Sequence, residues 1–167
     1  MDNGHSAYND LRNDRGVIEY AKESLFPFWE EAQGLFVEHW KEIAQSKNVI
    51  KLEPDTDKFK RLEEFGALEV YTARVNGVLV GYGVFIISNH LHYKSSLTAE
   101  SDLLYLHPHY RNGWAGYRLI KFCHDSLHKG KNVQRVMWRM KPHRDFSAII
   151  KRLGGKLHEY VYTTVRE

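Results

Sequence analysis

The sequence has few of the features that stabilise secreted or membrane proteins. It has one cysteine, Cys123, so an intramolecular disulfide is excluded and a reducing compartment such as the cytoplasm is expected. No apolar run approaches the roughly 20 residues that cross a bilayer, and no early segment resembles a signal peptide. Only four prolines occur in 167 residues, and no linker is evident. We expect a cytoplasmic protein without a membrane partner, with a flexible arm at residues 1–16 and one domain over 17–167.

An excess of one charge is also absent. The formal net charge is +3, while hydrophobic residues make up 43% and aromatic residues 13% of the chain, which excludes a disordered protein. Basic residues become more frequent after position 110: Arg111, Arg118, Lys121, Lys129, Lys131, Arg135, Arg139, Lys141, Arg144, Lys151 and Arg152. A solvated surface explains most of them, but the bias also fits a polyanionic ligand, which leaves nucleic acid open as a partner.

The spacing of apolar residues changes along the chain and predicts mixed secondary structure. Over residues 26–43 they recur every three or four positions, as on one face of a long helix that Gly34 kinks. The next helix is expected at 54–66, with Phe59, Leu62 and Phe65 facing inward. Two further helices are expected after the turn at 111–113 and at 146–153. Strands are expected at 17–21, 68–75, 78–87, 98–106, 135–140 and 156–165.

The order of these elements predicts the fold class. Asn76-Gly77 is a strong hairpin signal, so the middle strands form an antiparallel meander. A strand–helix–strand crossover, a helix and a last strand follow. We therefore expect an α/β (α+β) fold with a mixed, mostly antiparallel sheet of six or seven strands, flanked on both faces by about four helices.

The stretch from Leu103 to Phe122 is the most informative part of the chain. An apolar run is stopped by Pro108, which cannot donate to a sheet ladder, and a basic turn with glycines then leads into an amphipathic helix. No capping side chain precedes this helix, so its free N–H groups and positive dipole end are expected at the turn. Such a turn binds anions, usually phosphate, although an ordinary structural strand–turn–helix has the same pattern.

Element order and turn together resemble the GNAT superfamily of acyl-CoA-dependent N-acyltransferases, over residues 17–165. The family's turn, Q/R-x-x-G-x-G/A, follows a strand that ends in Val/Leu-x-Pro-x-Tyr-Arg. The segment Leu106-His-Pro-His-Tyr-Arg111 matches this approach, with Arg111 and Gly116 at the first and last signature positions and Trp114 in place of the usual central glycine. The Arg-x-Gly-x-Ala-Gly form is similar to that of small bacteriophage-encoded GNAT-like proteins, and Leu153-Gly154-Gly155 is similar to the family's closing Leu-Gly-Phe.

The resemblance implies acetyl-CoA as a co-substrate and no metal. Its diphosphate would bind the turn, and its pantetheine arm would run beside the strand through Leu104 and Leu106 like an added strand. The residues implied at the turn are Arg111, Asn112, Gly113, Trp114, Ala115 and Gly116. The resemblance also implies that the N–H group of about Leu106 faces the thioester carbonyl, where negative charge develops during transfer.

Two carboxylates on the core strand are candidates for the general base that an attacking amine needs. Glu100 and Asp102 lie two residues apart and share a face if the strand is regular. A carboxylate on an apolar strand is costly unless it is paired, solvated or used in chemistry. A hydrogen-bonded structural role for Asp102 and a solvated strand edge for Glu100 stay open beside the catalytic role.

Other candidates lie outside this strand. His92 precedes it and either reaches the cleft or belongs to a surface loop. The tyrosine that acts as the acid in many family members corresponds to about Ile150, so Tyr162, Tyr160 or Tyr105 is considered as its substitute. The pairs His90-x-His92 and His107-x-His109 could favour a metal, but no further ligands complete a site.

The function that these features favour is N-acetyl transfer from acetyl-CoA to a primary amine by direct attack, without a covalent enzyme intermediate. The acceptor, a small molecule or a protein, would enter opposite the cofactor, between the long N-terminal helix and the final strands. The acidic residues of that helix either attract a cationic amine or form its solvated face: Glu30, Glu31, Glu38 and Glu42. Two alternatives stay open: a phage-type enzyme that modifies a nucleobase or nucleotide, and a non-catalytic module that binds coenzyme A and inhibits a host protein. A homodimer is also left open.

Overall fold

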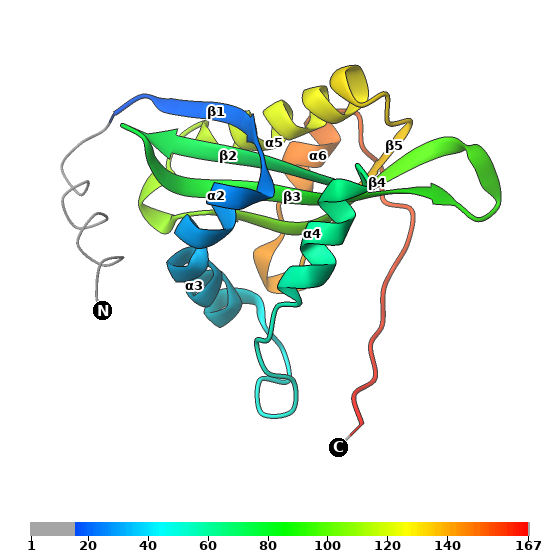
Figure 1. Ribbon diagram of the computed structural model, residues 1–167, viewed down its shortest axis with the longest axis horizontal. Helices are drawn as coiled ribbons and strands as arrows, with labels where there is room; N and C mark the ends of the chain where they lie inside the picture. Colours follow the sequence, from blue (N-terminus) through cyan, green and yellow to red (C-terminus); the bar gives the residue numbers. More distant parts are fainter. Residues whose placement is uncertain (1–15, 167) are drawn as a thin grey trace.

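A computed structural model describes residues 16–166 (Figure 1). Except for Gly16, the arm expected at residues 1–16 lies outside the described residues. Within them, five strands form one sheet in chain order: β1 (Ile18–Glu23), β2 (Leu68–Val75), β3 (Val78–His90), β4 (Tyr93–Leu106) and β5 (Arg135–Met137). The helices are α2 (Leu25–Glu31), α3 (Gln33–Ile43), α4 (Thr56–Glu64), α5 (Ala115–Asp125) and α6 (Ser147–Arg152).

The sheet is mixed because β5 runs parallel to β4, whereas β1 to β4 are antiparallel neighbours. Helices α2, α3 and α4 connect β1 to β2, short turns connect β2 to β3 and β3 to β4, and α5 carries the chain across the sheet to β5. Asn76 and Gly77 form the turn between β2 and β3 with φ angles of 49° and 81°. These left-handed values are those that a two-residue hairpin turn requires, and the predicted hairpin is confirmed.

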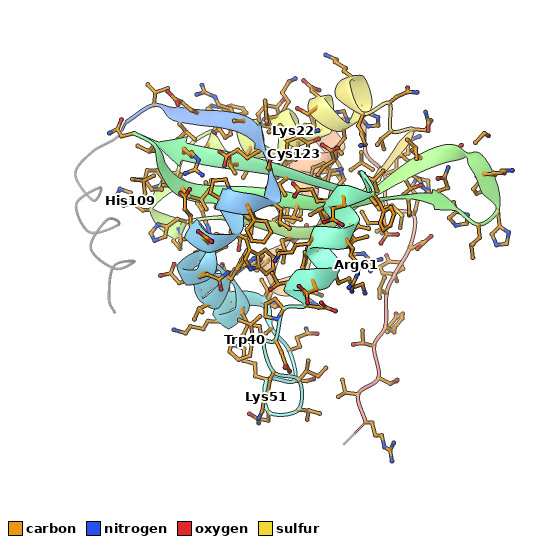
Figure 2. The ribbon with its side chains drawn as sticks, in the orientation of Figure 1. Lys22, Trp40, Lys51, Arg61, His109 and Cys123 are labelled. Atoms are coloured by element: carbon orange, nitrogen blue, oxygen red, sulfur yellow. The ribbon has the colours of Figure 1, made fainter. Side chains whose placement is uncertain are left out.

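Hydrophobic layers pack on both faces of the sheet. Helices α2, α3 and α4 cover one face, where Phe28 and Tyr82 are completely buried, and α5 covers the other (Figure 1). Cys123 of α5 lies in this second layer (Figure 2) and is completely buried, as predicted. Burial raises the pKa of its thiol, so Cys123 is a packing residue rather than a nucleophile.

The N-terminal helices differ from the prediction in two details. The single helix expected over residues 26–43 is broken at Ala32, not kinked at Gly34, and the break lets α2 and α3 both turn aromatic side chains into one core. In α4, Phe59 and Leu62 pack inward as predicted. The expectation for Phe65 is wrong: this residue follows the last residue of α4 and is 82% exposed.

The C-terminal segment is the largest departure from the predicted topology. Residues 156–166, expected to form a last strand, are extended chain that belongs to no strand of the described sheet. The mixed α/β class is confirmed, but the described sheet has five strands instead of six or seven, and five helices flank it.

Candidate functional site

Strand β4 carries a bulge and an open edge. Leu103 pairs with Val84 and Ser101 with Phe85, so Asp102 is an extra residue that no residue of β3 opposes. On its other side, β4 pairs with β5 only from Thr98 to Glu100. Among the described residues, the outer edge of β4 therefore has no neighbouring strand from Ser101 to Leu106.

The backbone groups of Leu104 and Leu106 face this open edge. The N–H of His107 donates to the carbonyl of Val80 in β3 at 2.8 Å, and N–H groups alternate between the two sides of a strand. Those of Leu106 and Leu104 consequently point away from β3. The Nε of Arg111 reaches the carbonyl oxygen of Leu106 at 2.6 Å, as an outward-facing group allows. This edge is able to bind an extended ligand that carries amides, in the manner of an added strand.

The turn that follows β4 ends at an uncapped helix. A short 3-10 turn, Pro108–Tyr110, leads to Gly113 with a φ of 68°, and α5 then begins at Ala115. Trp114 occupies the N-cap position without forming a side-chain cap hydrogen bond, as the sequence predicts. A Cβ added at Gly116 would meet nothing within 4 Å. The first turn of α5 thus presents its N–H groups and positive dipole end to open space.

The indole of Trp114 stands at the entrance to this turn. It is 57% exposed, with the guanidinium of Arg152 over its face at 5.4 Å and the ring of Tyr117 at its edge. An open pocket of about 290 Å³ adjoins it on the side of β1. Residues that line the pocket include Val17, Tyr20, Asn112, Trp114, Ala115 and Arg118.

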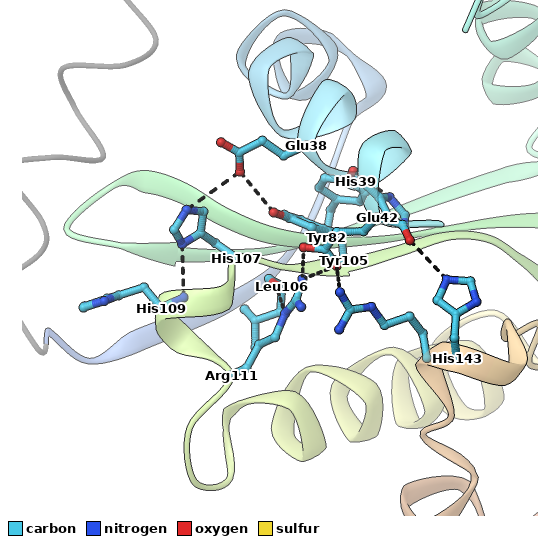
Figure 3. A network of polar contacts seen from close by, with 11 residues as sticks. Glu38, His39, Glu42, Tyr82, Tyr105, Leu106, His107, His109, Arg111 and His143 are labelled. Atoms are coloured by element: carbon cyan, nitrogen blue, oxygen red, sulfur yellow. Dashed lines mark hydrogen bonds and ion pairs between the residues drawn. The ribbon is translucent and has the colours of Figure 1, made fainter. Parts of the chain in front are cut away.

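An ion-pair network joins the turn to the N-terminal helices (Figure 3). Glu42 of α3 accepts two hydrogen bonds of 2.9 Å from Arg111, and Arg144 approaches the same carboxylate at 3.4 Å. The ring of His143 is 3.1 Å from the carbonyl oxygen of Glu42. The carboxylate is mostly buried, so this contact fixes the position of Arg111, the first signature residue.

A second group of polar side chains lies one helical turn earlier (Figure 3). Tyr105 donates to Glu38 at 3.1 Å, and Nε2 of His107 is 3.8 Å from the same carboxylate. Burial lowers the pKa of His107 and raises that of Tyr105, so both are neutral near pH 7. Glu38 remains 43% exposed and is oriented by these two neighbours.

His39 is buried beneath this group. Its Nδ1 lies 3.0 Å from the hydroxyl of Tyr82, and its ring packs against that of Tyr105. Only 5% of the residue is exposed, and burial lowers its pKa to about 4. Sequence patterns did not indicate His39 or Tyr82 as parts of the site, and they indicated His107 only as a possible metal ligand. The spacing of Glu38 and Glu42 was the one signal, because residues four apart share a helix face.

The two predicted carboxylates of β4 lie close to the same cation. Glu100 forms an ion pair with Arg139, which favours a structural role for its carboxylate. Asp102 has an exposed side chain at the bulge, yet partial desolvation raises its pKa, an effect that Arg139 and Lys58 oppose. Of these two carboxylates, that of Asp102 forms no ion pair with a described residue, and it lies beside the open edge.

The structure does not bring the other two predicted catalytic residues to this place. His92 lies in the exposed turn between β3 and β4, with its ring tilted against that of His90, at the opposite end of β4 from Leu106. Tyr162 belongs to the C-terminal segment and is 92% exposed. Within residues 16–166, no three His, Cys, Asp or Glu side chains are grouped so that they could hold a metal ion.

Comparisons of the sequence and of the fold with known proteins identify the family of this chain. The acetyltransferase (GNAT) family matches residues 18–149. The chain belongs to this family. No curated protein sequence matches it. Among the described helices, none has the length and apolar character to cross a membrane.

Solved structures show the GNAT fold over nearly the whole chain. The ribosomal-protein-alanine N-acetyltransferase of Brucella melitensis biovar Abortus 2308 is 17% identical, with a TM-score of 0.64, and covers 90% of this chain and 99% of its own. Glucosamine-6-phosphate N-acetyltransferase of Arabidopsis thaliana is 11% identical, with a TM-score of 0.65 and the same coverage. A protein of Clostridium acetobutylicum described as a predicted acetyltransferase, solved with acetyl-CoA, is 12% identical with a TM-score of 0.66, and the match covers 89% of this chain and 96% of its own.

Proposed function

We propose that this GNAT protein transfers an acetyl group from acetyl-CoA to a primary amine by direct attack. The observation that carries the proposal is the continuity of two binding features. The open edge of β4, with outward-facing groups at Leu104 and Leu106, leads directly to the uncapped first turn of α5. An extended chain with two amides and a diphosphate at its end matches both features at once.

The residues present fit this co-substrate. Backbone N–H groups between Asn112 and Gly116 would hold the diphosphate, and Gly116 leaves room for it because nothing lies within 4 Å of an added Cβ. The amides of the pantetheine arm would pair with Leu104 and Leu106. At the thioester, the N–H of Leu106 is the proposed donor to the carbonyl oxygen as negative charge develops there.

We take Asp102 as the general base, because it is the carboxylate beside the open edge of β4 that forms no ion pair with a described residue. The amine nitrogen forms a bond to the thioester carbon, its proton passes through bridging water to the carboxylate of Asp102, and the C–S bond then breaks to release the thiolate. The raised pKa of Asp102 makes its carboxylate a better proton acceptor than an ordinary surface aspartate. Ile150 stands where the family's usual acid tyrosine is found, so the thiolate takes its proton from solvent.

Glu38 supports a cationic acceptor. Of the four acidic residues on the N-terminal helices, Glu31 pairs with Arg74 and Glu42 pairs with Arg111. Glu30 is exposed on α2. Only Glu38 is both exposed and held by neutral side chains at the end of β4. Its carboxylate therefore keeps its charge available to an ammonium group near the end of β4. This supports a primary amine, on either a small molecule or a protein.

The test is titration calorimetry with acetyl-CoA, followed by thiol release with a panel of amines. Replacement of Gly116→Leu fills the space beside the first turn of α5 and is expected to abolish both binding and turnover. Gly34→Leu is the matched control, because Gly34 is also helical and also has nothing within 4 Å of an added Cβ. Equal affinity for acetyl-CoA in wild type and Gly116→Leu would refute the proposed cofactor site.

The same assay decides between the remaining functions. Thiol release with amines supports N-acetyl transfer, whereas release only with nucleotides or nucleic acid would identify the nucleobase-modifying alternative. Heat on binding of coenzyme A with no thiol release on any acceptor would identify a non-catalytic binding module.

A further inference from the structure

Three pairs of histidines are close in sequence within the described chain, and their hydrogen bonds distinguish one pair from the other two. In His90-x-His92 and His107-x-His109, Nδ1 of the first ring accepts the backbone N–H of the second residue, at 3.2 and 3.3 Å. A neutral ring that accepts at Nδ1 carries its proton on Nε2. The first ring of each of these pairs therefore has no lone pair left for a metal ion.

The third pair, His124 and His128, has the opposite arrangement. Nδ1 of His128 lies 2.7 Å from the carbonyl oxygen of Val133, and Nδ1 of His124 lies 3.3 Å from Oδ1 of Asp125. A carbonyl or an ionised carboxylate can only accept, so each neutral ring has its proton on Nδ1 and a lone pair on Nε2. No described residue forms a hydrogen bond with either Nε2. Outer partners hold metal-binding histidines in the same tautomer.

The backbone brings these two rings together at the end of α5. They are four positions apart, which places them on one face of a helix, and their ring centroids are 4.5 Å apart. His124 belongs to the last turn of α5, and His128 to the π-helical turn Ser126–Gly130 that follows it. Leu127 is completely buried and anchors this turn, whereas the side chain of His124 is 25% exposed. Both rings are therefore held near one another at a position that solvent reaches.

The charges around this pair favour a cation. The pair lies at the C-terminal end of its helix, which is the negative end of the helix dipole. A hydrogen bond from Lys121 lowers the pKa of Asp125, so the carboxylate beside His124 is ionised at neutral pH. Lys121 is already paired with the other oxygen of Asp125, which reduces its repulsion of a bound ion. Lys129 is an opposing charge nearby, so binding of moderate strength is expected.

We propose that His124 and His128 bind one divalent transition-metal ion, of the class of Zn²⁺ and Ni²⁺, through their two Nε2 atoms. Imidazole nitrogen suits these ions, whereas Mg²⁺ and Ca²⁺ prefer oxygen ligands. The described residues supply no third ligand, so water completes the coordination.

The bound ion would link the end of α5 to the turn that leads into β5, and would stabilise the folded chain because it binds only when both rings are in place. This position is at the opposite end of α5 from Ala115, where the helix begins. The metal site is therefore separate from the proposed acetyl-CoA site, and its test requires no turnover.

Titration calorimetry and thermal unfolding with ZnCl₂ or NiCl₂ alone test this site on the full chain without a histidine tag. We expect one ion per chain, and a rise in Tm with Zn²⁺ but not with Mg²⁺ at the same concentration. His124→Gln and His128→Gln should each weaken the affinity by about tenfold or more, because loss of even an outer partner costs about 10 to 100-fold. The matched control is the double variant His90→Gln/His92→Gln, which removes two histidines from the β3–β4 turn and should bind as the wild type does.

A second measurement makes the test independent of how the variants fold. In long-range ¹H–¹⁵N spectra of the wild type, Zn²⁺ should shift the Nε2 resonances of two histidines, while Nδ1 of both rings stays protonated. No heat with either ion, or equal affinity in the wild type and both single variants, would overturn the proposal. Loss of binding in the control variant would overturn it too, because the ion would then be bound at the β3–β4 turn.

Discussion

The two ends of strand β4 differ in how many other elements meet them. At the end formed by Leu106, side chains from α3, β3, the signature turn and the segment after β5 come together in the network of Figure 3. At the other end, the hairpin turn exposes Leu91 and His92, and its contacts are local. Both ends carry histidines, so residue type does not distinguish them. What distinguishes the candidate site is the convergence of segments distant in sequence, which fixes side chains and lowers their contact with water.

Among these substitutions, Asp102→Asn should cause the largest loss of activity. If Asp102 takes the proton of the amine, its loss is expected to lower kcat by about 10² to 10⁴-fold, the usual contribution of a general base. Because the folded protein raises the pKa of Asp102, wild-type activity should fall as pH decreases through that raised value, and the variant should lose this limb. Thiol release measured from pH 4 to 9 checks both effects. A kcat within threefold of wild type would exclude Asp102 as the base.

Protonation of His39 at acid pH should destabilise the end of β4 formed by Leu106. Its folded pKa of about 4 is below the ordinary 6.5, so the unfolded chain binds the proton more readily. The stability associated with neutral His39 is therefore present above pH 6.5 and is lost as pH falls toward 4, by about 3 kcal/mol in total. Urea unfolding at pH 7 and pH 4.5 measures the loss. His39→Gln, which keeps a hydrogen-bonding group near Tyr82, should reduce this pH dependence, and an unchanged dependence would contradict the assignment.

Glu42→Gln should lower the unfolding free energy by a smaller amount. The neutral amide would leave Arg111 and Arg144 near each other without their shared carboxylate, at an expected cost of about 1–3 kcal/mol in unfolding free energy. The affinity for acetyl-CoA should weaken as well, because Arg111 begins the turn whose N–H groups are proposed to hold the diphosphate. Chemical denaturation and calorimetry measure the two effects. Glu30→Gln, an exposed change on α2, is the matched control.

His92→Ala should have the smallest effect. Its side chain lies beyond the far end of β4, roughly 45 Å along the chain from Leu106 at about 3.3 Å per residue. We expect kcat/KM to change less than twofold and the unfolding free energy to stay within about 0.5 kcal/mol, as for an ordinary surface position. A tenfold loss of kcat/KM with normal folding would restore His92 as a catalytic candidate and weaken the contrast between the two ends.

Local sequence signals predicted the elements that local chemistry determines. The Asn76-Gly77 hairpin, the α4 stop at Gly66 and the uncapped start of α5 all follow from residues within a few positions of one another. The break at Ala32 and the exposure of Phe65 depend on tertiary packing, which periodicity does not contain. The C-terminal segment has a strand's composition, but composition does not reveal whether a neighbouring strand is present.

The candidate site was predictable only in part for the same reason. The signature turn is continuous in sequence, so its residues were found together. The bulge at Asp102 interrupts the regular alternation on which the shared face of Glu100 and Asp102 was predicted. The sequence of β4 alone does not indicate this extra residue. His39 and Tyr82 meet across 43 residues of sequence, and only the folded chain brings them within 3.0 Å of each other.

The bidentate contact between Arg111 and Glu42 has a consequence for the order of events during turnover. One end of this pair belongs to the turn proposed to hold the nucleotide portion of the donor, and the other belongs to the helix beside the acceptor's entrance. A ligand that shifts Arg111 therefore shifts α3 as well, and by thermodynamic reciprocity an acceptor that shifts α3 alters the donor's affinity by the same factor. Donor and acceptor should not bind independently, and the interaction coefficient from bisubstrate kinetics would depart from unity in the wild type and return toward it in Glu42→Gln.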